Sequence, residues 1–247
     1  CFLFFMLKRS RMTQIKSLND LHVAGTRGIV IAAWIASFVL AWRALTLGGP
    51  STEALVFSVL ANLVPTYFAY TKSTDTKVSY SVALMVAAQP ALFVYAMQLS
   101  PWQIDMHMYF FVALASLTVL CDLRPIVAGA LLIAAHHLLL ALVAPSWVFA
   151  GGGGIPRVLI HAPAVVLQAG ILGTIAVSLT ATLRRSASAR EEAQQALEST
   201  RAERALREQL EHDLNERRRT ELVEIGQAFE TSVSRVATAL ADTALTL

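Results

Sequence analysis

The sequence contains few charged residues and only two cysteines. Asp, Glu, Lys and Arg make up 15% of the 247 residues, whereas an ordinary soluble domain has about 25%. Hydrophobic residues reach 55%. The scarcity of charge excludes an ordinary soluble globular protein and predicts an integral membrane protein. Cys1 and Cys121 lie far apart, so the sequence offers no disulfide framework.

Catalytic signatures are also missing from the sequence. It contains no nucleophile elbow, no glycine loop placed before a helix to hold phosphate, and no Cys pair at metal-binding spacing. The net charge of +3 is spread over two very different halves and gives no reason to expect nucleic-acid binding. We therefore do not expect an enzyme or a nucleic-acid-binding protein.

Long apolar stretches dominate the first three quarters of the chain. A membrane-spanning helix needs about 20 mostly apolar residues, and six stretches qualify, at about 26–45, 53–71, 78–99, 106–121, 125–143 and 158–183. Turn-forming residues separate them. The sequence predicts an all-α fold, with a six-span transmembrane bundle at 26–183 that contacts the lipid bilayer.

The distribution of basic residues predicts how this bundle is oriented. Positively charged residues gather in loops on the cytoplasmic side of a membrane. In this chain they precede the first span, separate spans two and three and spans four and five, and follow the sixth, as Lys8, Arg9, Arg11, Lys16, Arg27, Lys72, Lys77, Arg124, Arg184 and Arg185. Both termini are therefore predicted to be cytoplasmic. Residues 1–25 form a cytoplasmic N-terminal segment, in which Met12 is an alternative start.

The chain changes character at Arg184 and becomes polar, free of proline and rich in strong helix formers. Residues 184–221 are predicted to form a charged helical linker, or alternatively a defined relay module. Residues 222–247 carry an apolar seam with alternate spacings of four and three, which predicts a cytoplasmic coiled coil and hence a homodimer. The seam consists of Leu222, Gly226, Phe229, Val233, Val236, Leu240, Thr243 and Leu247.

Four histidines lie in the last three apolar stretches. His107 opens the fourth, His136 and His137 lie inside the fifth, and His161 lies near the start of the sixth. At a rise of about 1.5 Å per residue, all four lie in the outer half of the bilayer. Because ionisable residues inside a membrane are costly, they indicate a functional site. Helices joined by short loops pack side by side, so the imidazoles can surround one point.

Imidazole is a ligand of copper, iron, zinc and nickel, and facing histidine pairs also hold haem. We expect a transition metal (Cu, Fe or Zn) or haem b, with His107, His136, His137 and His161 as candidate ligands. Adjacent residues on a helix point about 100° apart, so His136 and His137 cannot both face one centre symmetrically. One is expected to be the primary ligand, and the other a second ligand or an orienting hydrogen-bond partner. Asp105 and Gln168 are candidates for orienting the ligands by hydrogen bonds. The alternative is that each histidine is an interfacial residue bonded to headgroups or water.

Two stretches resemble a known family. The run WQIDMHMYFFVALASLTVLCDLRPIVAGALLIAAHHLLLAL, with PSWVF and RVLIHAPAVVLQAG after it, resembles the membrane-embedded sensory region of a group of bacterial methyl-accepting chemotaxis proteins. The tail VEIGQAFETSVSRVATALA resembles the start of the helical signalling domain of such receptors. The positions that match the family's recurring residues are Asp105, His107, Asp122, Arg124, His136, His137 and His161. Relatives often carry Glu at the position of Gln168.

The resemblance implies a sensory receptor in the bacterial inner membrane that signals to an adaptor and a histidine kinase. The hairpin that binds these partners is expected to lie downstream of Leu247. Two other classes compete with this interpretation. A membrane metalloprotein with redox or electron-transfer activity would turn over without the tail, and a small transporter would need a polar path through both leaflets.

Overall fold

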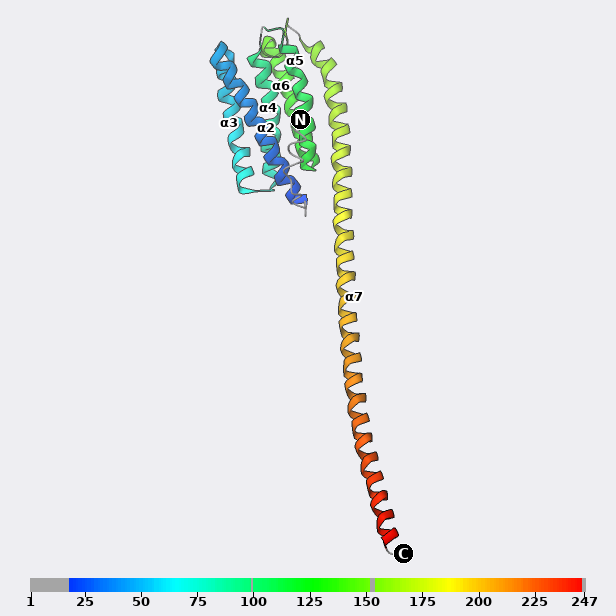
Figure 1. The fold of residues 1–247 in the computed structure, drawn as a ribbon. Helices are drawn as coiled ribbons and strands as arrows, with labels where there is room; N and C mark the ends of the chain where they lie inside the picture. The colour runs from blue at the N-terminus through cyan, green and yellow to red at the C-terminus, as the bar shows by residue number, and fades with distance from the viewer. Residues whose placement is uncertain (1–17, 99, 152–153, 246–247) are drawn as a thin grey trace. The chain divides into compact units, whose positions relative to one another are not determined.

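The computed structural model of the protein describes residues 18–98, 100–151 and 154–245, with side chains up to residue 240. The predicted all-α fold is confirmed in this part of the chain. The helices, labelled as in Figure 1, are α2 (Leu18–Leu47), α3 (Pro50–Thr71), α4 (Thr76–Ala96), α5 (Gln103–Ser116), α6 (Leu123–Val143) and α7 (Ile155–Leu245). Two short 3₁₀ turns, η1 (Leu117–Leu120) and η2 (Pro145–Trp147), follow α5 and α6.

Six helices in the described ranges are long and apolar enough to cross a membrane, which suggests a multi-pass membrane protein. Each corresponds to one predicted span, although the boundaries differ. The first helix begins at Leu18 rather than near residue 26, and α2 packs against η1 around Gly25. A Cβ on Gly25 would lie 2.7 Å from Cγ1 of Val119, so only glycine allows this approach. The segment before Leu18, including Met12, lies outside the described residues.

Helix α4 is the centre of the bundle and contacts α2, α3, α5 and α6 (Figure 1). More than half of its most apolar window, 56%, is buried inside the protein, against 28% for α2, α3, α5 and α6. Its buried side chains, among them Val82, Met85 and Val86, share one hydrophobic core with Leu114 of α5 and Leu117 of η1. The packing of α5 and α6 on this common helix fixes their relative positions.

A closed ring of hydrogen bonds joins α2, α3 and α4 inside the bundle. The Asn62 amide donates to Ser37 (2.9 Å), and the Gln89 amide donates to Oδ1 of Asn62 (2.8 Å). The Ser58 hydroxyl donates to Gln89 (2.9 Å) and lies 2.6 Å from the Ser37 hydroxyl, whose proton has both Ser58 and the carbonyl oxygen of Ala33 (3.1 Å) within reach. All four side chains are buried. Within a membrane such polar contacts hold helices together, because lipid offers no substitute partner.

The predicted linker and coiled-coil segments are both part of α7, which is helical from Ile155 to Leu245. The chain divides into a unit that ends at Ala187 and a unit that begins at Ser188. In the second unit the seam residues Leu222, Phe229, Val233, Val236 and Leu240 are all exposed in this single chain. The side chains of Thr243 and Leu247 lie outside the described part.

Candidate metal site

Three of the predicted histidines form a triangle at one end of the bundle. His107 lies in the second turn of α5, His137 lies near the end of α6, and His161 lies in the second turn of α7. Their ring centroids are separated by 5.7 Å (His107 to His137), 6.2 Å (His107 to His161) and 6.1 Å (His137 to His161). Three consecutive helices thus each contribute one imidazole to the same place.

The three imidazoles share one hydrogen-bonding arrangement. Each Nδ1 faces the carbonyl oxygen four residues earlier, at 3.1 Å for His107, 2.8 Å for His137 and 2.8 Å for His161. A carbonyl oxygen can only accept, so Nδ1 carries the proton in each ring. In a neutral imidazole the lone pair then belongs to Nε2. Metal-binding histidines commonly have this arrangement, in which the N–H that does not face the metal is held by an acceptor.

Two phenylalanines pack against the histidine triangle. Phe149, which is buried, lies 6.0 Å from His107, 6.1 Å from His137 and 5.7 Å from His161, centroid to centroid. Phe110, also buried, lies 5.0 Å from His137. The guanidinium of Arg157 lies 5.4 Å from the centroid of Phe149. These rings make the surroundings of the imidazoles apolar and limit the space between them.

The structure separates the roles of the two adjacent histidines. The His137 side chain is 6% exposed and faces His107 and His161. His136 contacts the ring of His137 (5.2 Å) and that of Phe110 (5.7 Å), and its Nε2 is buried without a partner in the described protein. The rotation of α6 about its own axis, which the sequence does not fix, places His137 in the triangle and His136 beside it.

The two expected orienting residues have other surroundings. Asp105 is exposed and makes no hydrogen bond to a histidine among the residues described. The Gln168 amide donates to the carbonyl oxygen of Phe111 at 2.9 Å and so ties α7 to α5. The carbonyl groups of Gln103, Ile133 and Arg157 orient the rings in place of these side chains.

Sequence reasoning missed two residues that position the triangle. The Gln103 side chain is fully buried and donates to the carbonyl oxygen of Ser146 at 2.9 Å, which ties the start of α5 to the turn η2 after α6. Phe149 lies in the same loop and supplies the apolar ring described above. Gln103 lies four residues before His107, but this spacing accounts only for the backbone carbonyl that His107 faces and not for the role of the Gln103 side chain.

The arrangement is compatible with a single metal ion after a small inward movement of the rings. Three imidazoles bound through nitrogen at about 2.1 Å from one Zn²⁺ have ring centroids roughly 5 Å apart, slightly closer than those observed. As they stand, no three His, Cys, Asp or Glu side chains in the described ranges are close enough to ligate one ion. Haem fits less well, because Phe110 and Phe149 pack beside the rings where a porphyrin would need space.

The fold and the histidine triangle therefore define an all-α protein, suggested to be multi-pass, with a polar cluster among three of its apolar helices. No known protein family, no curated protein and no solved structure matches this chain. The resemblance to chemotaxis receptors accordingly remains a hypothesis.

Proposed function

We propose that the protein is a transmembrane sensory receptor of the chemotaxis type, in which a transition metal ion bound by His107, His137 and His161 controls the position of α7. The observation that carries this proposal is the triangle of imidazoles. Its three rings come from three helices and hold their Nδ1 protons in the same way. A bound ion would supply a charged, directional link between these helices.

The packing of α7 supports a regulatory role for such a link. Only 11% of the most apolar window of α7 is buried inside the protein, less than for any other candidate span in the described ranges. Two hydrogen bonds, from Gln168 to Phe111 and from Thr180 to Cys121, join α7 to the bundle. Because so little of α7 is buried, a coordinate bond from His161 would add substantially to what holds it there. Gaining or losing the ion then shifts the balance between two positions of α7.

The signal would leave the membrane through the same helix. Residues 222–245 of α7 carry most of the predicted seam for pairing with a second copy, and exposed seam residues such as Phe229 and Leu240 leave that face available. An adaptor and a histidine kinase would act on a segment downstream of Leu247, as in the chemotaxis receptors that the sequence resembles. The proposed location is the bacterial inner membrane with both termini cytoplasmic.

The buried polar ring in α2 to α4 bears on the transporter alternative. A transport path needs polar groups that can exchange partners with a solute. Ser37, Ser58, Asn62 and Gln89 instead bond to one another in a closed ring. This favours a structural role for the ring and a sensory role for the protein. The redox alternative requires a metal that changes oxidation state, which a spectrum of the loaded protein distinguishes.

The proposal is tested on the full chain in lipid nanodiscs, loaded separately with Cu⁺, Fe²⁺ or Zn²⁺. Bound metal is measured by elemental analysis, haem by its absorption spectrum, and helix pairing by cross-linking of a cysteine at Val233. One ion per chain and a metal-dependent change in cross-linking are expected. His161→Ala should lose both, while His212→Ala, a histidine on the exposed part of α7, should lose neither. Equal metal binding by wild type and His161→Ala would overturn the proposal.

A further inference from the structure

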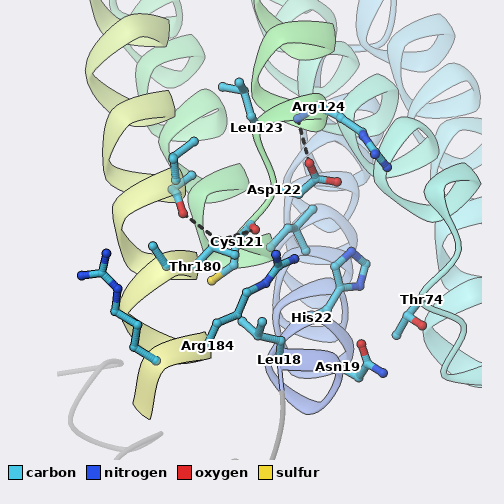
Figure 2. A pocket seen from close by; sticks show the side chains of 15 residues that line it. Leu18, Asn19, His22, Thr74, Cys121, Asp122, Leu123, Arg124, Thr180 and Arg184 are labelled. Atoms are coloured by element: carbon cyan, nitrogen blue, oxygen red, sulfur yellow. Dashed lines mark hydrogen bonds between the residues drawn. The ribbon is translucent and has the colours of Figure 1, made fainter. Parts of the chain in front are cut away.

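A second polar site lies at the end of the bundle opposite the histidines. A pocket of about 680 Å³ opens there between the start of α2, the corner from Leu120 to Arg124 that joins η1 to α6, and residues 176–185 of α7 (Figure 2). Arg124, Arg184 and Arg185 line it together with a single acidic residue, Asp122. The pocket therefore has an excess of positive charge.

The acidic residue is already engaged within the protein. Oδ1 of Asp122 accepts the backbone N–H of Arg124 at 3.0 Å and caps the start of α6. The start of α6 is thus not itself a free anion site.

Of the three basic side chains, that of Arg124 donates to the Thr76 hydroxyl at 3.3 Å, and the other two have no such partner in the described ranges. Arg184 and Arg185 make no hydrogen bond or ion pair with any residue in the described part of the chain. Figure 2 shows the Arg184 side chain reaching from α7 toward α2, where His22 and Leu18 lie. Nε2 of His22 shares a hydrogen bond of 3.3 Å with the Ser79 hydroxyl. The other ring nitrogen, Nδ1, is buried and has no partner among the described residues. Two guanidinium groups and one ring nitrogen are available to a ligand.

The position of the pocket indicates the chemistry of that ligand. The apolar run of α7 ends at Leu183, so Arg184 and Arg185 lie at the level of lipid headgroups. About two turns further into the span, the same pocket is lined by Leu120, Leu123 and Val177. The lining therefore changes from cationic at the membrane border to apolar inside, as a lipid does from headgroup to acyl chain.

We infer that this pocket binds a phosphate group, with Arg184 and Arg185 as its main partners, and that the phosphate belongs to an anionic lipid of the adjacent leaflet. Guanidinium groups recognise phosphate through paired, charge-assisted hydrogen bonds. Basic pockets between helices at the membrane border bind anionic headgroups in this way. The bound phosphate joins α7 to the α2 and α6 ends of the bundle, beside the hydrogen bond of 2.7 Å that Thr180 donates to the carbonyl of Cys121.

The test measures lipid retention by native mass spectrometry of the full chain, with phosphatidylglycerol and phosphatidylcholine offered in equal amounts. The wild type should retain phosphatidylglycerol preferentially. Arg184→Gln and Arg185→Gln should each weaken this retention about tenfold, which corresponds to the loss of one charge-assisted hydrogen bond. Arg190→Gln is the matched control, because it removes the same charge from the same helix outside the pocket, and it should have no effect.

The remaining outcomes decide whether the phosphate comes from a lipid or from solution, and whether the pocket binds it at all. If inorganic phosphate displaces phosphatidylglycerol and protects the wild type from unfolding equally well, the site stands and its ligand is free phosphate. If all three variants retain phosphatidylglycerol equally poorly, the retention depends on the general surface charge, and the pocket has no special role. Unchanged retention in Arg184→Gln and Arg185→Gln would overturn the inference outright.

Discussion

The imidazole of His107 lies 5.7 Å from that of His137, centroid to centroid, although the two side chains come from different helices. Both hold their Nδ1 protons on the carbonyl oxygen one turn earlier in their own helix. Helix-internal hydrogen bonds of this kind orient each ring independently of its neighbours. The two rings therefore have their orientation fixed without a bound ligand.

The first prediction separates the two adjacent histidines. His137→Ala should remove most of the bound metal, because His137 faces both other rings, whereas His136→Ala should reduce metal affinity by a smaller factor. Loss of a ligand usually costs more affinity than loss of a supporting contact, which costs about 10- to 100-fold. Metal content after dialysis against a weak chelator measures both. A larger loss in His136→Ala would contradict the assignment of His137 to the triangle.

The second prediction concerns the hydrogen-bonded ring in α2 to α4. Gln89→Leu removes one of the two ring partners of Asn62 and of Ser58, leaves Oδ1 of Asn62 without its donor, and should destabilise the protein by about 1 to 3 kcal/mol. Thermal unfolding in detergent measures the change. Ser81→Ala is the control in the same helix, because the one hydrogen bond of the Ser81 hydroxyl among the described residues is to the nearby carbonyl of Val78. If Ser81→Ala lowered the melting temperature as much as Gln89→Leu does, the ring would contribute no more to stability than an ordinary helix hydrogen bond.

The third prediction follows from the basic residues. A reporter fused after Arg185 should be cytoplasmic, and a tag inserted at Gly151, an exposed loop position, should be accessible from outside the cell. Labelling of intact cells with a membrane-impermeant reagent distinguishes the two sides. Labelling of the Arg185 fusion in intact cells would reverse the predicted orientation.

The fourth prediction concerns Phe229, the largest side chain of the seam, which is 70% exposed in the single chain. If the seam pairs two copies, this ring becomes a buried core residue, and Phe229→Ala should weaken the dimer by about 3 to 5 kcal/mol. Cross-linking through a cysteine at Val233 should fall, while metal content stays unchanged. Phe229→Ala with full cross-linking would mean that residues 222–247 are a helical spacer.

Some features were predictable because they depend on spacing along one helix. Apolar length located all six candidate spans, and the rise per residue placed His107, His137 and His161 at a common depth. Features that depend on the rotation of a helix were not predictable. The choice between His136 and His137 and the ring from Ser37 to Gln89 both require knowing which face of each helix meets α4. No periodicity in an almost uniformly apolar span reveals this.

The closed ring also has a consequence for how the chain assembles. Its four members come from α2, α3 and α4, and the three clustered imidazoles come from α5, α6 and α7, so each half of the bundle has its own polar centre. Inserted helices find one another after entering the bilayer. Because both halves share one apolar core around α4, fragments separated in the loop between α4 and α5 should need each other to fold, and co-expression of split halves becomes a practical way to label one centre without touching the other.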